Sequence, residues 1–443
     1  MAGTQISIPV STRLEQIAIR AREAPGMAFN NLAHLIDLDL LREAYRRTRK
    51  SGAVGVDERT AADYEANLEH NLQDLWQRMK DGRYVAPPVR RVNIPKGEGK
   101  TRPIGIPTFE DKVAQRAVAM VLEAVYEQDF YDCSYGFRPG RSPHDALDAF
   151  RNRAMETGGG WVLEVDIEKF FDTLDHRHLR DFLDRRVQDK GIRRLIGKWL
   201  NAGVMEEGQL TRNEFGTPQG GVISPILANV YLHEVLDRWF FEMAAPAMEA
   251  QVFLVRYADD FVILCRNERD ARRLERVMPK RFGKFGLRVN LEKSRLVDFR
   301  RPPKREGEPP VKPGTFDLLG FTHHWGRSRN GNWVIRQKTA SARLRRSLKS
   351  VAEWCRWNRH KPLHEQHRRL SLVLRGHFRY YGVTANGRRL NQFKHQVGRI
   401  WRKWLDRTSQ KARKTWAWMN RYLKRCPLPP VRLYRSQWQA AKP

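Results

Sequence analysis

The spacing of apolar residues predicts helices over much of the chain. Apolar positions recur every three to four residues in segments 12–50 and 111–127, which is the repeat of one helix face, and segment 221–240 is apolar enough to be a largely buried helix. In the second of these segments the face consists of Ala114, Ala117, Val118, Val121 and Val125. From about residue 337 to the Cys-Pro-Leu-Pro-Pro sequence at 426–430 the pattern is again helical, but rich in basic residues.

Shorter apolar runs predict strands between these helices. Residues 89–95 and 102–107 form two such runs joined by a Gly-containing turn, and residues 161–167 form a β-rich run that ends near a carboxylate. Residues 252–265 contain two apolar runs around a short polar turn, which is the pattern of a β-hairpin. This order of elements predicts an α+β body followed by a helical C-terminal domain.

Composition and charge indicate what kind of partner the chain binds. The chain has 443 residues, too many for one compact domain, and 41% of them are hydrophobic, which excludes a disordered protein. Its formal net charge is +32. Residues 336–443 hold 29 Lys and Arg against three acidic residues, a net of +26, and seven of the 13 Trp. Cations interleaved with aromatic rings indicate phosphate contact and base stacking, and therefore nucleic-acid binding.

The spacing of the cysteines, the N-terminal sequence and the length of the apolar runs indicate the cellular compartment. The four cysteines, Cys133, Cys265, Cys355 and Cys426, are far apart, which argues against a disulfide framework or a structural zinc site. The N-terminus lacks the pattern of a signal peptide, and no apolar run is long enough to span a membrane. We therefore expect a cytoplasmic protein, in bacteria one of the cytoplasm or nucleoid, without a membrane partner.

Two acidic positions stand out as candidate chemistry. Asp166 ends a predicted strand, and Asp259 and Asp260 occupy the turn of the predicted hairpin. Paired aspartates in a turn are usually solvated, but the flanking apolar strands should bury this turn against a sheet, and unpaired buried acids are costly. Carboxylates at the ends of adjacent strands could hold the two Mg²⁺ ions that phosphoryl transfer to a 3′-hydroxyl requires.

The Tyr-Ala-Asp-Asp sequence at 257–260, preceded by Arg256, resembles the catalytic box of reverse transcriptases. Six further segments resemble motifs of that family, in the family's order: 94–108, 134–147, 165–179, 216–237, 286–296 and 316–321. Seven motifs in order are far more specific than any one of them. The resemblance implies an RNA-directed DNA polymerase with a right-hand fold, in which fingers and a palm with an antiparallel sheet precede an α-helical thumb.

The motifs are most similar to those of group II intron-encoded reverse transcriptases, which act as maturases. Residues 41–60 resemble the N-terminal motif of that family, and residues 341–359 and 374–393 resemble its thumb or maturase domain. The resemblance implies four parts: a helical RNA-binding N-terminal extension (1–85), fingers and palm (86–325), a basic helical thumb/maturase domain (336–425) and a short basic tail (426–443).

The resemblance also implies roles for single residues. Asp166, Asp259 and Asp260 match the catalytic metal-binding triad, and the backbone carbonyl of Ile167 should face a metal as well. The nucleotide-binding positions of the family are matched by Lys96, Arg102, Phe171 and Gln219.

Among these four, Lys96 and Arg102 match the cations that clamp the triphosphate, and Gln219 matches a contact near the sugar. Phe171 matches the aromatic ring that excludes a 2′-hydroxyl, whereas its neighbour Phe170 is expected in the core. Contacts to template or RNA are expected from Arg138, Arg141, Arg375 and Arg379.

The implied cofactor is a pair of Mg²⁺ ions, with Mn²⁺ as an alternative metal. The implied partners are a group II intron RNA, an RNA template with a DNA primer, deoxynucleoside triphosphates (dNTPs) and target DNA. The sequence leaves monomer and dimer both open. After residue 430 it shows no clustered His and Cys, so we expect a compact form without the family's zinc-binding endonuclease.

Three functions fit these residues. The first is a mobile-element protein that binds its own intron RNA, assists its splicing and copies it into DNA. The second is a domesticated relative acting in phage defence or DNA repair. The third, a splicing cofactor with an inactive polymerase, conflicts with the complete set of catalytic residues. The intact catalytic box and the absence of unfamiliar domains favour the first.

Overall fold

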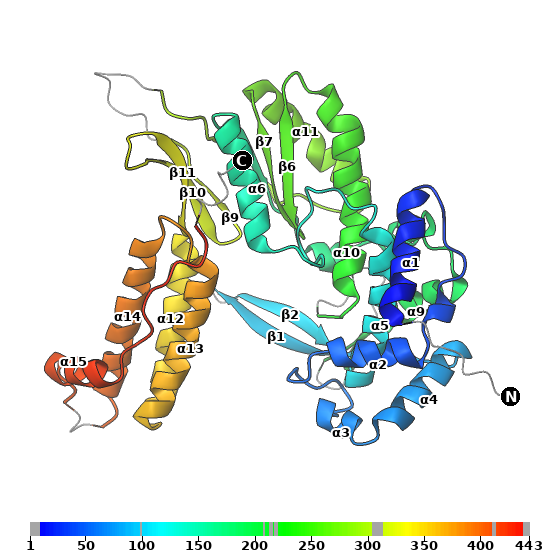
Figure 1. Cartoon of the computed structure of the whole chain (residues 1–443), viewed down its shortest axis with the longest axis horizontal. Helices are drawn as coiled ribbons and strands as arrows, with labels where there is room; N and C mark the ends of the chain where they lie inside the picture. The colour runs from blue at the N-terminus through cyan, green and yellow to red at the C-terminus, as the bar shows by residue number, and fades with distance from the viewer. Residues whose placement is uncertain are drawn as a thin grey trace. The chain divides into compact units, whose positions relative to one another are not determined.

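The computed structural model describes residues 9–97, 100–206, 209–211, 216, 220–303, 313–409 and 413–436. The chain divides into two compact units, one made of Met1–Phe150 and Leu163–Leu296 and the other of Arg151–Val162 and Val297–Pro443. Each unit combines helices with strands (Figure 1), so the predicted α+β class is confirmed. None of the helices within the described ranges is long and apolar enough to cross a membrane.

The N-terminal helices differ from the prediction at one point. Helix α1 (Val10–Glu23) and helix α2 (Leu38–Arg47) are separated by a loop with one 3₁₀ turn, so the predicted helical pattern over 12–50 is interrupted. Leu32 is nevertheless fully buried. The loop is fixed by Asp189, whose carboxylate accepts hydrogen bonds from the backbone N–H groups of Leu32 (2.6 Å) and Ala33 (2.9 Å). A distant carboxylate thus supports a loop whose apolar spacing resembles that of a helix.

Three further helices complete this part of the first unit: α3 (Ala61–Glu65), α4 (Leu68–Lys80) and α5 (Phe109–Tyr126). Helix α5 carries the predicted apolar face, and Ala114, Ala117, Val118, Val121 and Val125 are all fully buried. Its N-terminus is capped by Thr108, whose hydroxyl accepts from the N–H of Asp111 at 3.2 Å.

A long β-hairpin lies between α4 and α5 in the sequence. Strands β1 (Val89–Gly97) and β2 (Lys100–Ile106) pair antiparallel, with a register shift between Pro95 and Gly97. They belong to a sheet of order β2-β1-β4-β5, in which β4 is Val204–Glu206 and β5 is Gln209–Thr211. The two predicted strands are therefore confirmed, with a bulge at Lys96 that the sequence did not indicate.

The second sheet has the order β6-β7-β3-β8. Its strands are β6 (Val252–Tyr257), β7 (Asp260–Cys265), β3 (Trp161–Val165) and β8 (Arg295–Asp298). Strands β6 and β7 form the predicted hairpin, with Tyr257 paired to Asp260. After the exposed Asp260 the next five residues of β7 are all buried, as the apolar run predicts.

Further helices lie before or between these strands in the sequence. Their bounds are α6 (Pro143–Glu156), α7 (Phe170–Thr173), α8 (His176–Asp184), α9 (Lys190–Leu200), α10 (Ser224–Leu232) and α11 (Glu268–Gly283). Helix α10 continues into a π-helical turn, His233–Asp237, so the predicted helix over 221–240 is present with a change of winding.

The second unit has its own sheet and its own helical core. The sheet order is β11-β10-β9, with β9 at Phe316–Leu318, β10 at Phe321–Arg327 and β11 at Trp333–Thr339. The helices are α12 (Ser341–Trp357), α13 (Leu363–Tyr381), α14 (Gly387–Leu405) and α15 (Trp416–Arg425). Trp401 is fully buried among them, and its indole N–H donates to the Gln366 side chain at 2.9 Å. The basic C-terminal segment is thus a packed helical bundle.

Candidate active site

The two acidic clusters lie on neighbouring strands. Asp166 follows the last residue of β3, and Asp259 and Asp260 lie in the turn between β6 and β7, where β7 is the direct neighbour of β3 in the sheet. Asp259 is half-buried and Asp260 is exposed. Carboxylates that are far apart in the sequence are therefore carried by adjacent strands.

The backbone around Asp166 is held by the segment that precedes β8. The Asp166 N–H donates to the Ser294 hydroxyl at 3.1 Å, and its carbonyl accepts from the Asn290 N–H at 2.8 Å. The next residue, Ile167, is buried and forms an antiparallel bridge with Val289. The Asp166 carboxylate is 38% exposed and forms an ion pair with the Lys293 ammonium at 3.2 Å.

The donor set fits a hard divalent cation, because carboxylate oxygens are the ligands that Mg²⁺ prefers. In the described part of the chain, however, no three His, Cys, Asp or Glu side chains converge closely enough to hold a metal ion. Lys293 instead supplies the positive charge beside Asp166. A metal ion at this carboxylate would have to displace the lysine or share the carboxylate with it.

Beneath the aspartate turn lies a buried ion pair. Arg256, the last but one residue of β6, is fully buried, and its guanidinium donates to both carboxylate oxygens of Asp237 at 2.8 and 2.5 Å. The same guanidinium donates to the Asn229 side-chain oxygen at 3.0 Å and to the Ala258 carbonyl at 3.2 Å. Burial alone would lower the pKa of Arg256, but the charge and hydrogen bonds of Asp237 raise it, so the guanidinium stays charged.

This network fixes the turn from below. Ala258 adopts a left-handed conformation (φ 57°), and its carbonyl is held by Arg256. Gly136 packs directly against it: a Cβ at that position would lie 2.2 Å from the Ala258 nitrogen. The Gly136 carbonyl in turn accepts from the Asn229 side-chain nitrogen at 2.8 Å. Three motifs that are distant in sequence therefore meet under the aspartates.

Sequence reasoning missed these supporting residues, although the signal was present. An arginine inside an otherwise apolar strand must find a partner, because an unpaired buried charge is costly. Asp237 lies at the end of an apolar helical segment and is the acid that pairs with Arg256. Nothing in the sequence, however, indicates that the two positions face each other.

The structure describes only some of the candidate nucleotide-binding residues in full. Arg102 is exposed on β2, opposite Ile94 of β1. Lys96 lies at the bulge of β1, and its side chain is outside the described part of the structure, as is the whole of Gln219. Next to Gln219, Gly220 has φ 113° and lies against β2, where a Cβ would come within 2.6 Å of the Gly105 carbonyl oxygen.

The two phenylalanines of α7 differ as expected. Phe170 is buried and packs edge-on against Tyr231, with ring centroids 6.4 Å apart, so the predicted core position is confirmed. Phe171 is only half-buried. Its carbonyl oxygen lies near Gly216, where a Cβ would approach it to 2.9 Å, and Gly216 takes the left-handed φ of 90°. The glycine therefore lets the backbone at Gly216 lie close to Phe171.

Comparison with known proteins agrees with this arrangement. The family model described as reverse transcriptase (RNA-dependent DNA polymerase) matches residues 94–323, which include both acidic clusters. The chain belongs to the reverse transcriptase family. The predicted enzyme class, RNA-directed DNA polymerase, is thereby confirmed.

Several curated relatives are similar over long stretches. Protein YkfC of Escherichia coli (strain K12) is 34% identical over 65% of this chain and 84% of its own length. Group II intron-encoded protein LtrA of Lactococcus lactis subsp. cremoris is 39% identical over 53% of this chain, which spans only 39% of LtrA. Nuclear intron maturase 1 of Arabidopsis thaliana is 29% identical over 39% of this chain. The predicted resemblance to group II intron-encoded reverse transcriptases is confirmed.

The four candidate RNA contacts fall into two classes in this reverse transcriptase. Arg138 is buried and donates to Glu127 (2.9 Å) and to the carbonyls of Tyr131 and Ser134, so its side chain holds a loop together. The Arg138 side chain is only 3% exposed, and its expected template contact stays a prediction. Arg141 is partly exposed and pairs with Asp132 at 2.6 Å.

In the second unit, Arg375 and Arg379 are both exposed on α13. They are four residues apart and therefore share one face of the helix. Within the described residues, neither forms an ion pair with an acidic side chain. Their position leaves them available for a polyanion.

Proposed function

We propose that this chain is a group II intron reverse transcriptase, which binds its own intron RNA, assists its splicing as a maturase and copies it into DNA during intron mobility. The observation that carries the proposal is the placement of Asp166 and the Asp259–Asp260 turn on neighbouring strands of one sheet, above a buried ion pair. A solvated loop does not need a buried ion pair beneath it. A turn that must hold carboxylates in fixed positions does need such support.

In the proposed reaction the 3′-oxygen of a DNA primer attacks the α-phosphate of a dNTP, and pyrophosphate leaves. Two Mg²⁺ ions, held by Asp166, Asp259, Asp260 and the Ile167 carbonyl, would supply the positive charge that this transfer requires. The chain's own contribution is to keep the carboxylates in register. Asp166 is held through its backbone by Ser294 and Asn290, and the other two are held through the Arg256–Ala258 contact.

Contacts to the nucleotide are proposed for the β1–β2 hairpin and for α7. Arg102 and Lys96 would face the triphosphate, because a hairpin can present two cations to one anion. Phe171 would lie under the sugar and leave no room for a 2′-hydroxyl, and Gln219 would contact the same sugar. The close approach of the Gly216 backbone to α7 and of the Gly220 backbone to β2 supports this grouping, since these two glycines flank Gln219 in the sequence.

RNA binding is proposed for the helices of the second unit. Exposed Trp side chains lie beside cations there: Arg356 is 5.6 Å from the Trp357 ring, and Arg402 is 4.7 Å from the Trp416 ring. Trp357 is 69% exposed. Such pairs offer phosphate contact and base stacking at the same place. Intron RNA, an RNA template with its DNA primer and target DNA are the partners that this surface and the carboxylates would serve.

Primer extension on an RNA template tests the polymerase site. The wild type should extend with dNTPs and Mg²⁺, whereas Asp259→Asn combined with Asp260→Asn should lose activity by several orders of magnitude, since the substitutions remove metal-binding charge but keep the shape. Asp74→Asn, at an exposed carboxylate of α4, is the matched control and should retain activity. Equal activity of the double variant and the control would refute the proposed metal site.

Sequencing the RNA that copurifies with the protein tests the maturase role. One long RNA that contains this protein's reading frame between intron-like ends would support it. A separate small RNA, or a broad range of transcripts, would favour a domesticated polymerase in phage defence or DNA repair instead.

A further inference from the structure

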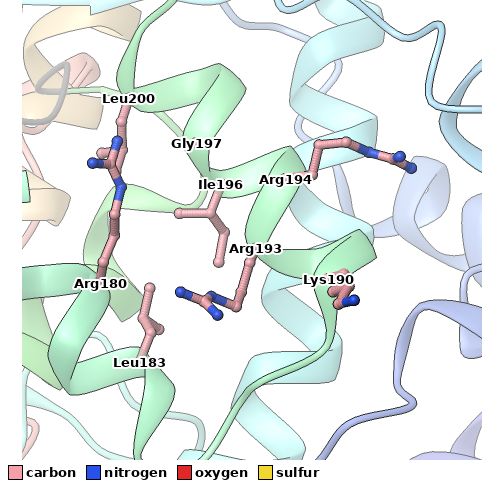
Figure 2. Close-up of a pocket in the computed structure, with 8 residues that line it drawn as sticks. All are labelled: Arg180, Leu183, Lys190, Arg193, Arg194, Ile196, Gly197 and Leu200. Atoms are coloured by element: carbon pink, nitrogen blue, oxygen red, sulfur yellow. The ribbon is translucent and has the colours of Figure 1, made fainter.

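A hollow of about 300 Å³ lies between α8 and α9. Cationic and apolar side chains line it together. Figure 2 shows the side chains of Leu183 and Ile196 between those of Arg180, from α8, and Arg193, from α9. Lys190 and Arg194 complete the cationic lining, and no carboxylate is among the residues that line this hollow.

Few acidic side chains pair with the cations around this hollow. Arg180 and Lys190 are exposed and form no ion pair with any acidic residue that the structure describes. Arg193 alone has such a partner, Asp184 at 2.7 Å. Positive charge also affects the neighbouring turn of α9, where burial and then repulsion by Arg194 lower the pKa of Lys198. A site with this balance attracts anions.

A second hollow of about 610 Å³ lies beside the first. The two share Lys190 and Arg193, and the second is also lined by Asn30 and Gln188, whose amides can donate and accept hydrogen bonds. Two acids also line this second hollow: Asp184, which pairs with Arg193 at 2.7 Å, and the buried Asp189, whose carboxylate accepts from three backbone N–H groups. Two neighbouring hollows that share cationic side chains suit a chain of repeated phosphates better than a single small anion.

The wall of the first hollow contains a glycine in the middle of a helix. Gly197 lies inside α9, and a Cβ built there would meet no atom within 4 Å. Glycine is less favourable than alanine in a helix interior, and packing does not require it here. Its effect is to leave the hollow open above Ile196 and Leu183.

We propose that these two hollows bind a single-stranded segment of structured RNA. The apolar base of the first hollow receives one unstacked nucleotide, and the rim cations Arg180, Lys190 and Arg193 contact the phosphates on either side. Unpaired nucleotides of RNA loops are the segments whose bases can enter such a pocket. This inference rests on the proposed RNA-binding role and adds to it a binding site in the first unit, outside the basic helices of the second.

The open space at Gly197 allows a clean test. Gly197→Glu places a carboxylate in the hollow without a backbone clash, and Gly197→Ala is the matched control. Binding of the full-length protein to a labelled RNA stem-loop should weaken about tenfold for Gly197→Glu and should stay unchanged for Gly197→Ala. Single-nucleotide addition on a short primer–template should be the same for both variants, which shows that both are folded.

A second pair of variants tests the phosphate contacts. Arg180→Gln with Lys190→Gln should reduce the slope of log affinity against log salt by about 0.7 to 1 for each phosphate that the protein no longer neutralises. Arg276→Gln with Lys280→Gln removes the same charge from the exposed face of α11 and should change the slope less.

The outcomes separate this inference from the proposed function. Equal RNA affinity of Gly197→Glu and Gly197→Ala, in a wild-type protein that binds the stem-loop, would overturn the site but leave the proposed function standing. If Gly197→Glu weakened binding to a DNA or to an acidic peptide but not to the RNA stem-loop, the assignment to RNA would be overturned. A wild type that does not bind the stem-loop at all would count against the proposed function itself.

Discussion

The buried pair of Arg256 and Asp237 gives the sharpest prediction. Asp237→Asn keeps the shape of the side chain but removes its charge, so the Arg256 guanidinium remains buried without a counter-ion. Breaking a buried pair in this way costs about 3–5 kcal/mol. Because a folded domain is stable by about 5–15 kcal/mol, the variant should unfold at a clearly lower denaturant concentration.

A second variant separates stability from activity. Arg256→Met with Asp237→Leu replaces the pair by apolar side chains, a change that is often neutral or stabilising for buried pairs. Stability should therefore recover to within about 1–2 kcal/mol of the wild type. The Ala258 carbonyl, however, still lacks the guanidinium that holds it at 3.2 Å. The kcat of primer extension should stay at least tenfold below wild type, while the KM for dNTPs changes little.

The assays are denaturant unfolding and steady-state primer extension on the same preparations. An exposed ion pair, between Glu268 and Arg272, provides the control, because both side chains are about half exposed. Glu268→Gln breaks this pair and should lower the free energy of unfolding by no more than about 1 kcal/mol. Wild-type kcat in the apolar double variant would refute the idea that Arg256 positions the aspartate turn. A loss below about 1 kcal/mol for Asp237→Asn would refute the energetic reasoning.

Three further predictions concern single residues. Phe171→Ala should raise ribonucleotide incorporation by opening the space under the sugar, and an unchanged dNTP/rNTP preference would contradict the proposed gate. Burial raises the pKa of Asp111 to about 6, although Tyr84, Trp199 and Gln115 donate hydrogen bonds to it. Because this carboxyl binds its proton more tightly in the folded chain, its contribution to stability should fall as the pH rises from about 4 to 6, and Asp111→Asn should remove that part of the pH dependence in unfolding experiments. Lys293→Met removes the cation beside Asp166, so half-maximal primer extension should require less Mg²⁺; an unchanged or higher requirement would show that Lys293 does not compete with the metal.

Much of the fold follows from local patterns. The strands at 89–95 and 102–107, the hairpin at 252–265 and the helix over 111–127 were predicted because each buries one face, and alternating or helical spacing reports such faces directly. The loop between α1 and α2 was not predicted. Its leucines have helical spacing, but the backbone there bonds to the Asp189 carboxylate, which lies 157 residues away from Leu32. Long-range contacts of this kind override local propensity.

The candidate site divides in the same way. The three aspartates were proposed from their motifs, and the predicted burial of Phe170 was confirmed. Arg138 was assigned to the template because it is a cation within a polymerase motif, yet the fold buries it against Glu127 and two carbonyls. A sequence shows that a residue is charged, but not whether its charge faces solvent or closes a loop.

The sequence by itself therefore determined the class of enzyme, the three carboxylates that are candidates for its metal site and the basic character of its C-terminal helices, because motif order and charge are properties of the chain. Only the tertiary structure decided what supports those carboxylates and where else a polyanion could bind. Arg256, Asn229 and Gly136 meet under the aspartate turn, and the cations of α8 and α9 gather around one hollow, through packing between segments that are distant in sequence. Such meetings depend on distances between side chains, which the folded chain sets and the linear order does not.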